Sequence, residues 1–264
     1  MRNLKYKPTS PIEHPLISKE DVAKMRAYYF NEDSSNLKFL LEKRYGWMNN
    51  FIKNDDIGVE FGSGTGFSKL FIKCRNFKIT DINDYEWLDE SGIDVTNSPY
   101  QSNSLDFVLV SNLIYTLPIP QLFFKEMERI LRPGGVVIIH EVNASWSMRR
   151  IVKVRKHEGY DFTYKAFENA TTHSHANNSI NIAIPRLLFD HKNIFESKVP
   201  AFKIVYSGFS EFLILLNSGG LSTQTKFLRL PRFLLKLVNK VDKILIKITP
   251  QTFALQRQIV IQKK

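Results

Sequence analysis

Residues with chemical potential are concentrated in a glycine-rich segment that follows a short apolar run. Residues 58–66 read Gly-Val-Glu-Phe-Gly-Ser-Gly-Thr-Gly, and the acidic residue Glu60 stands two positions before Gly62. When a buried strand breaks into such a turn and continues as a helix near Phe67, several backbone N–H groups point into one crevice. The pattern therefore predicts a binding site for a nucleotide-like cofactor.

The glycine spacing and the next acidic residue limit which cofactor this crevice can bind. A dinucleotide fingerprint requires G-x-G-x-x-G, but counting from Gly62 places Phe67 where the third glycine should stand. No Gly-Lys-Ser/Thr follows, so the segment is not a Walker phosphate loop. Asp81 comes nineteen residues after Gly62 at the end of a second strand-like run, where a carboxylate can accept both hydroxyls of a ribose. For the motif alone, a chance glycine-rich turn is the alternative.

The elements that must position these residues alternate between strands and helices. Strands are expected at 57–61, 77–81, near Ile93, 105–110 and 136–140, and helices at 19–30, from 36 to about 53, 67–74 and 120–131. Two further strands, 202–206 and 256–261, are expected to close the sheet as an antiparallel pair. Near-continuous apolar runs are typical of a parallel sheet buried on both faces. The pattern predicts a doubly wound α/β fold.

Glu60-x-Gly62-x-Gly64-x-Gly66 followed by Asp81 resembles the class I S-adenosylmethionine-dependent methyltransferases. Residues 94–108 are similar to the family's approach to its fourth strand, and residues 126–135, which end in Arg-Pro-Gly-Gly, to its turn before the fifth. The similarity covers roughly residues 55–142. It implies a Rossmann-like seven-stranded methyltransferase sheet with S-adenosyl-L-methionine as the cofactor.

The resemblance also implies a role for each residue that matches the family's motif. The implied cofactor-binding residues are Glu60, Gly62, Ser63, Gly64, Thr65 and Gly66 around the methionine part, Asp81 at the ribose, Ile82, Asp94 and Val95 at the adenine, and Ser111 and Asn112 beside the sulfonium. Many relatives have Glu-His after the fourth strand, where this chain has Tyr115-Thr116, so no histidine base is implied there.

A general base is the remaining catalytic question. A sulfonium is an activated leaving group, so alignment of the acceptor with the methyl carbon supplies much of the acceleration, and only a poorly ionised acceptor such as a hydroxyl needs a base. The candidates are His140 and Glu141, at the carboxyl end of the fifth strand where ligands bind, and His157 beyond it. A structural role is the alternative for His140, and simple solvent exposure for His157.

Length and composition indicate one globular domain, since 264 residues with 43% hydrophobic content can bury a full core. We divide it into an N-terminal arm and helices over the cofactor (1–54), the cofactor-binding core (55–143), a substrate-side insertion (144–200), and closing strands with an inserted basic amphipathic helix (201–264). In the insertion, His173 and His175 have a spacing that could ligate a metal ion, but solvated loop histidines are commoner and no metal is assigned. Such polar side chains would also suit a hydroxyl-rich sugar.

Positive charge is concentrated at the end of the chain. Residues 219–264 hold ten lysines and arginines against one acid, Asp242, which accounts for +9 of the net +11. If residues 232–248 are helical, two opposite faces result: apolar Phe233, Leu234, Leu237, Val238, Val241, Ile244, Leu245 and Ile248, and basic Arg232, Lys236, Lys240, Lys243 and Lys247. Such a helix can lie on an anionic membrane surface. The alternative is a helix packed on the domain with a solvated lysine face.

These observations favour a methyltransferase for a small-molecule, sugar or glycolipid acceptor, acting by O-methylation. An RNA methyltransferase with the basic segment along phosphates is an alternative, disfavoured because residues 111–114 lack an Asn-Pro-Pro-Tyr-like signature. A non-catalytic, cofactor-binding regulatory protein is another. The N-terminus lacks an apolar signal core, and the single Cys74 rules out an internal disulfide, so we expect a cytoplasmic protein, with peripheral attachment to the inner membrane face left open.

Overall fold

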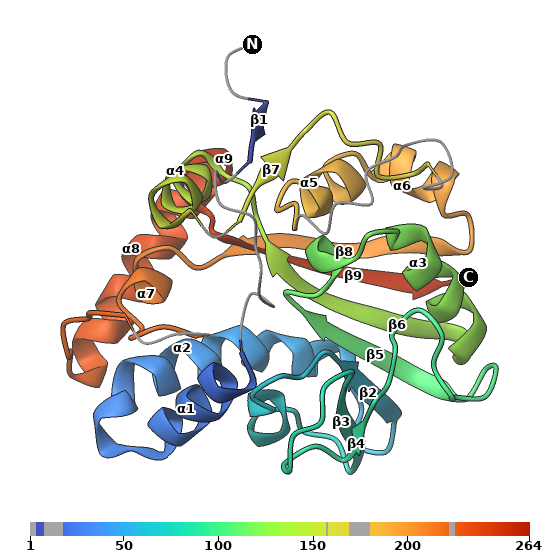
Figure 1. The fold of residues 1–264 in the computed structure, drawn as a ribbon, viewed down its shortest axis with the longest axis horizontal. Coiled ribbons are helices and arrows are strands. Elements are labelled where there is room, and N and C mark those ends of the chain that lie inside the picture. Colours follow the sequence, from blue (N-terminus) through green and yellow to red (C-terminus); the bar gives the residue numbers. More distant parts are fainter. Residues whose placement is uncertain (1–3, 8–17, 157, 169–179, 222–224) are drawn as a thin grey trace.

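The fold is built on a seven-stranded sheet with strand order β4-β3-β2-β5-β6-β9-β8 (Figure 1). The computed structural model describes residues 4–7, 18–156, 158–168, 180–221 and 225–264. The strands of this sheet are β2 (Ile57–Phe61), β3 (Asn76–Asp81), β4 (Glu90–Ser91), β5 (Leu105–Ser111), β6 (Leu131–Val142), β8 (Phe202–Ser210) and β9 (Gln256–Lys263). Strand β9 is antiparallel to both of its neighbours, and the other pairs are parallel. The predicted doubly wound α/β fold with an antiparallel closing pair is confirmed.

The central strand β5 shows why the sheet forms here. Its apolar residues alternate between two buried clusters: Phe107 and Leu109 pack on one face of the sheet, and Val108 and Val110 on the other. All four are fully buried. Since burial of such a side chain stabilises the fold by roughly 1.5–3 kcal/mol, a strand that is apolar on both faces requires helices on both.

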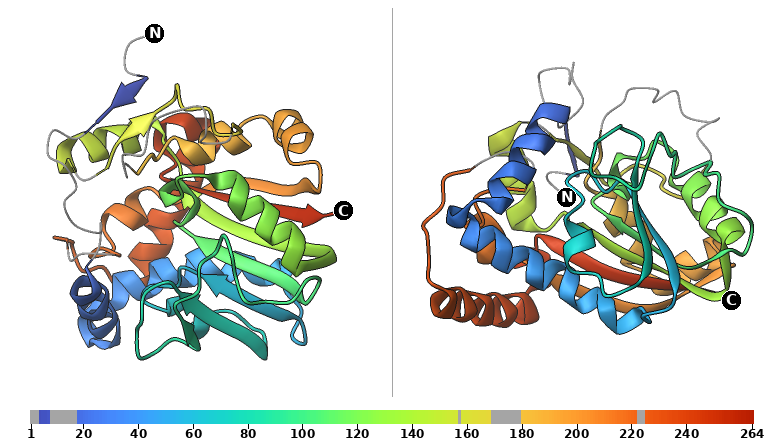
Figure 2. Two further views of the ribbon diagram at one scale, coloured as in Figure 1. Left: turned by 45° about the vertical axis from the view of Figure 1, so that its right-hand side comes forward. Right: turned by 90° about the horizontal axis from the view of Figure 1, so that it is seen from below.

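Two sets of helices cover the two faces (Figures 1 and 2). On the face of Phe107 the cover is α1 (Lys19–Phe30), α2 (Ser35–Gly46) and η2 (Trp47–Phe51), and η1 (Glu32–Ser34) joins α1 to α2. On the face of Val108 it is α3 (Pro120–Ile130), α5 (Ile184–Phe189) and α6 (Lys192–Lys198). Helix α1 has the predicted bounds and begins with a capping box, in which Asp21 N donates to Ser18 Oγ at 3.0 Å.

The helix predicted at 67–74 is wrong in length, because the structure has only one turn of 3₁₀ helix, η3 (Phe67–Leu70). The cause is Asn49, whose side chain accepts from Lys73 N at 2.7 Å and donates to Phe71 O at 3.0 Å. These backbone groups would otherwise continue the helix. Three smaller differences are that β4 lies just before Ile93, β6 begins at Leu131, and the predicted second helix ends as η2.

The region after β6 begins beyond the carboxyl end of that strand. It contains α4 (Trp146–Arg155) and β7 (Tyr160–Asp161), followed by α5 and α6. The N-terminal strand β1 (Lys5–Tyr6) pairs antiparallel with β7, and Lys5 Nζ lies 2.7 Å from Asp161 Oδ2. The described part of the N-terminal arm is therefore docked on this insertion.

A second insertion lies between β8 and β9. It contains α7 (Leu213–Leu216), α8 (Arg232–Ile248) and α9 (Pro250–Phe253), so the expected basic helix has the predicted bounds. The prediction of one apolar and one basic face is wrong in one respect. The side of α8 that packs on the domain belongs to neither predicted face and is formed by Leu235, Asp242 and Ile246. In the part of the chain that the structure describes, no helix is long and apolar enough to cross a membrane.

Candidate active site

The predicted cofactor residues meet at one edge of the sheet, where β2, β3 and β5 end. The register places Phe61 of β2 beside Thr80 of β3 and Val110 of β5. The segments that follow these strands are the glycine turn at 62–66, Asp81 with Ile82, and Ser111 with Asn112. Because the strands are parallel and neighbours, their carboxyl ends share one crevice.

The glycine turn needs glycine at three positions. Gly62, Gly64 and Gly66 have φ of +68°, +48° and +66°, in the left-handed region that favours glycine. A Cβ on Gly66 would lie 2.9 Å from side-chain atoms of Ile79 and Trp87, whereas a Cβ on Gly64 would meet no protein atom within 4 Å. Gly66 therefore allows close packing, and Gly64 faces open space.

Asp81 joins the end of β3 to this turn. Its Oδ2 accepts from Gly64 N at 2.9 Å, and its Oδ1 accepts from Asn83 N at 2.8 Å. The next residue, Ile82, is 66% exposed, which leaves a bare apolar surface beside a buried carboxylate. Ile93 N donates to Asp81 O at 3.1 Å, and this contact brings the segment with exposed Asp94 and buried Val95 to the same place.

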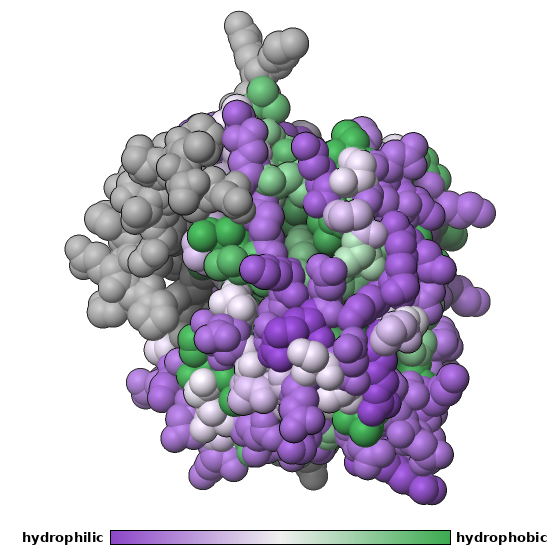
Figure 3. Space-filling view, turned by 90° about the vertical axis from the view of Figure 1, so that its right-hand side faces the viewer, coloured by the Kyte–Doolittle hydropathy of each residue, from purple (hydrophilic) through white to green (hydrophobic). Residues whose placement is uncertain are grey.

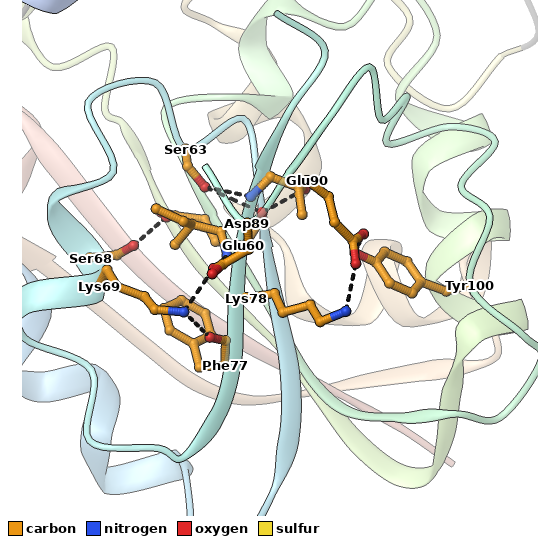
Figure 4. Close-up of polar contacts among 11 residues, drawn as sticks. Glu60, Ser63, Ser68, Lys69, Phe77, Lys78, Asp89, Glu90 and Tyr100 are labelled. Carbon is orange, nitrogen blue, oxygen red and sulfur yellow. Dashed lines mark hydrogen bonds and ion pairs between the residues drawn. The ribbon is translucent and has the colours of Figure 1, made fainter. Parts of the chain in front are cut away.

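Glu60 supplies a second carboxylate beneath the turn. It is buried and accepts a hydrogen bond from the Ser68 hydroxyl (Figure 4). Burial, and to a smaller extent the charge of Asp81, raise the pKa of Glu60 to about 7, although hydrogen bonds from Ser68 and Ser63 oppose the shift. A carboxylate whose charge is disfavoured in this way gains most from a cationic ligand. Nearby, Lys69 Nζ lies 2.7 Å from Asp89 Oδ2 and ties η3 to the chain after β3 (Figure 4).

Two side chains that the sequence did not reveal hold the turn from outside. Arg26 Nη1 of α1 donates to Thr65 O at 2.6 Å, and Trp87 Nε1 donates to Gly64 O at 2.8 Å. The Arg26 guanidinium also lies 4.9 Å from the centre of the Trp87 ring. Helix α1 thus covers the turn, but no local pattern marks Arg26, which is 39 residues from its partner.

The loop after β5 is held by Glu141. Its Oε1 accepts from Leu113 N at 2.7 Å and from Ile114 N at 2.6 Å, at the start of η4 (Ile114–Thr116). Burial raises the pKa of this fully buried carboxyl to about 7. Asn112 has φ of +53°, and its buried Oδ1 has no hydrogen-bond partner among the described residues. A buried acceptor without a partner among the described residues therefore lies on the loop after β5, next to Leu113, whose side chain would be 3.0 Å from a Cβ on Gly62.

His140 lies in a buried network of charged groups. Its Nε2 is 3.2 Å from Glu211 Oε1, and Arg44 Nε donates to the same oxygen at 2.9 Å. Burial lowers the pKa of His140, while the Glu211 carboxylate opposes the shift. This placement favours the structural alternative for His140, whose role as a base stays a prediction.

The remaining polar candidates of the insertion are not covered by the structure. His157, His173 and His175 lie outside the described residues. Among the residues that are described, no group of three or more His, Cys, Asp or Glu side chains is arranged to hold a metal ion.

The sheet order and the helices on both faces are those of the Rossmann-like methyltransferase fold. The structure aligns with that of a SAM-dependent methyltransferase from Archaeoglobus fulgidus, with a TM-score of 0.50, 15% identity, and coverage of 90% of this chain and 99% of that chain. A possible histamine N-methyltransferase from Thermotoga maritima aligns with a TM-score of 0.48 and 16% identity, covering 93% and 98%. No curated protein matches this sequence.

Residues 59–139 match the family model described as a methyltransferase domain. The match contains the glycine turn, Asp81 and Asn112, which are the residues that meet at the sheet edge. Residues 59–139 therefore form an S-adenosylmethionine-dependent methyltransferase domain, and S-adenosylmethionine is its cofactor.

The residues present fit this cofactor chemically. Its methionine part carries an ammonium and a sulfonium, and the residues at this sheet edge include the buried Glu60 carboxylate and the buried Oδ1 acceptor of Asn112, which has no partner among the described residues. The open space at Gly64 leaves room for a ligand against the backbone. When bound, the cofactor supplies a methyl group on an activated sulfur.

Gly64→Ala is expected to raise the dissociation constant for S-adenosylmethionine at least about tenfold and to leave the protein folded. The new methyl group would point into open space. The positive φ at position 64 costs an alanine only about 1–2 kcal/mol. Isothermal titration calorimetry measures the affinity. Gly66→Ala is the matched comparison, and we expect it mainly to lower the unfolding temperature, because its methyl group would press on Ile79 and Trp87. Full affinity in folded Gly64→Ala protein would contradict a cofactor lying against Gly64.

Proposed function

We propose that this methyltransferase acts on a small-molecule, sugar or glycolipid acceptor and that the methylated atom is an oxygen. The observation that carries the proposal is that the crevice is covered from two sides. Arg26 binds α1 to the glycine turn, and on the other side the loop after β5 is bound to the first insertion. There Tyr115 Oη donates to Glu158 Oε1 at 3.2 Å, and Asn181 N donates to Tyr115 O at 3.3 Å. Covers of this kind suit a small acceptor better than a nucleic-acid duplex.

In this proposal the chain's own residues orient the cofactor and the acceptor. Glu60 holds the ammonium, Asp81 holds the ribose hydroxyls, and Asn112 lies beside the sulfonium. The other positions are taken from the resemblance: the turn Gly62, Ser63, Gly64, Thr65 and Gly66 around the methionine part, Ile82, Asp94 and Val95 at the adenine, and Ser111 beside Asn112. Exclusion of water by α1 and the first insertion then favours alignment of the acceptor with the methyl carbon.

An oxygen acceptor must lose a proton, and Glu141 fits this task better than His140. A base works best when its pKa is near the working pH, and the pKa of Glu141 is about 7. Its Oε2 has no hydrogen-bond partner among the described residues. Tyr115 is unsuitable, because burial raises its pKa well above the usual value and keeps it protonated.

Incubation with ¹³C-methyl-labelled S-adenosylmethionine and a cell lysate, separated into organic, small aqueous and RNA fractions, tests the proposal. We expect label in the organic or the small aqueous fraction, and the ¹³C chemical shift of the product to identify an oxygen-bound methyl group. The Asp81→Ala protein is the control. Label in RNA that this control lacks would replace the proposal with an RNA methyltransferase, and bound cofactor without any product would favour a regulatory protein.

A further inference from the structure

Helix α8 is fixed on the domain by one narrow side. Leu235, Asp242 and Ile246 are its buried residues. The Asp242 carboxylate accepts from the N–H groups of Phe212, Leu213 and Ile214 at 2.9–3.1 Å, where α7 begins. Because a buried carboxylate with three such bonds is costly to displace, the rotation of α8 about its own axis is fixed.

The opposite side of α8 is an exposed apolar stripe. Its members are Phe233, Leu237, Val241, Ile244 and Ile248, which are between 39% and 69% exposed. Their spacings of three and four residues place them on one side of a helix. At about 100° per residue this side lies roughly opposite Asp242 and Ile246. Packing within the described part of the chain therefore does not account for the stripe.

A row of cations runs along the stripe for the whole helix. Each apolar member is directly preceded in the sequence by a basic residue: Arg232, Lys236, Lys240, Lys243 and Lys247. All five are exposed, and Arg232 Nη2 also lies 2.6 Å from Glu42 Oε2, so the four lysines carry most of the row's charge. Helix α8 lies at the outer edge of the molecule, which is clear in the right-hand view of Figure 2. The right-hand face of Figure 1, away from α8, is predominantly hydrophilic (Figure 3).

We propose that α8 docks this protein on the anionic surface of a lipid bilayer. The apolar stripe enters the interface between headgroups and acyl chains, and the basic row binds lipid phosphates. Charge complementarity selects this partner, since a second copy of the helix would bring two basic rows together. A nucleic acid would use the cations and leave the apolar stripe in water. The inference does not depend on which acceptor is methylated.

Sedimentation of the purified 264-residue chain with vesicles tests the docking. We expect binding to vesicles of phosphatidylcholine and phosphatidylglycerol, weaker binding as salt is raised, and little binding to phosphatidylcholine alone. Leu237→Glu with Ile244→Glu is expected to abolish binding. Charge reversal of Lys236, Lys240 and Lys243 to glutamate is expected to weaken it at least about tenfold.

The matched control variants carry the same number and kind of substitutions, but at exposed residues outside α8. Leu122→Glu with Ile194→Glu alters residues that are 45% and 48% exposed on α3 and α6, and reversal of Lys125, Lys198 and Lys203 alters exposed lysines. Both controls should bind vesicles like the unchanged protein, and circular dichroism verifies that all variants are folded.

Three results would overturn the proposal. The first is that the unchanged protein does not sediment with anionic vesicles, and the second is that the matched controls lose as much vesicle binding as the α8 variants. The third is a concentration-dependent dimer that Leu237→Glu with Ile244→Glu abolishes, while the protein binds no vesicles. The last result would assign the stripe to a second copy of the chain. Methyl transfer is measured without vesicles, so failure of the docking and failure of the proposed acceptor class are distinguishable.

Discussion

Arg44→Met is expected to lower the free energy of unfolding by about 3–5 kcal/mol at pH 7. Arg44 and Glu211 are both buried, and Arg44 Nε donates to Glu211 Oε1 at 2.9 Å. Methionine keeps much of the volume but leaves the Glu211 carboxylate buried without its cationic partner. Urea unfolding followed by circular dichroism measures the loss. A loss below about 1 kcal/mol would contradict a stabilising role for this pair.

The same pair should make stability depend on acid pH. Burial alone would raise the pKa of Glu211, but Arg44 and then His140 hold it at about 2, below the usual 4.5. A carboxyl whose pKa is lowered in the folded state contributes stability that is present above pH 4.5 and is lost as the pH falls from 4.5 towards 2. The difference between the unchanged protein and Arg44→Met should therefore shrink over this range.

Arg44→Met with Glu211→Gln is the matched control for both effects. Replacement of both charges removes the buried unpaired carboxylate, so the double variant should recover much of the stability that the single change loses. Glu60 and Glu141, whose pKa values are raised to about 7, lose their stabilising contribution as the pH rises from 4.5 to 7. Both are present in every variant, so the comparison isolates the contribution of Glu211.

The elements best predicted from the sequence are those whose signals are local. Helix α1 has its cap at Ser18, α8 has helical periodicity throughout, and β5 is an apolar run, so all three lie where the sequence placed them. The short η3 could not be predicted, because the residue that ends it, Asn49, is 24 positions from Lys73. Periodicity also showed that α8 is amphipathic, but its packed side depends on the N–H groups of α7.

The residues of the candidate site likewise fall into those that a local signal predicts and those that it does not. The glycine turn and Asp81 belong to one sequence motif and were predicted, and the fold brings them together. Arg26 and Trp87 act through partners 39 and 23 positions away, and Arg44 is 167 positions from Glu211. Such pairs arise only when the chain is folded. Alternation along β6 likewise separates His140 from Glu141, but it does not reveal that Glu211 lies beside His140.

Asp81→Ala is expected to lower the affinity for S-adenosylmethionine by about 100-fold or more while the protein stays folded. Hydrogen bonds to a charged group are each worth about 1.5–3 kcal/mol, and a ribose offers two hydroxyls to this carboxylate. Since 1.4 kcal/mol is a factor of ten, loss of both corresponds to about two or more powers of ten. Calorimetric titration measures the affinity, and thermal unfolding separately measures stability.

Asp84→Ala removes an exposed carboxylate three positions later and should leave the affinity unchanged. Asp81 Oδ2 also accepts from Gly64 N. Asp81→Ala therefore removes a hydrogen bond that holds the same turn that Gly64→Ala alters. The two changes should therefore be less than additive in a double-mutant cycle, since they act on residues in direct contact. Unchanged affinity in Asp81→Ala would sink the placement of the ribose, and strict additivity would mean that the carboxylate binds the cofactor without ordering the turn.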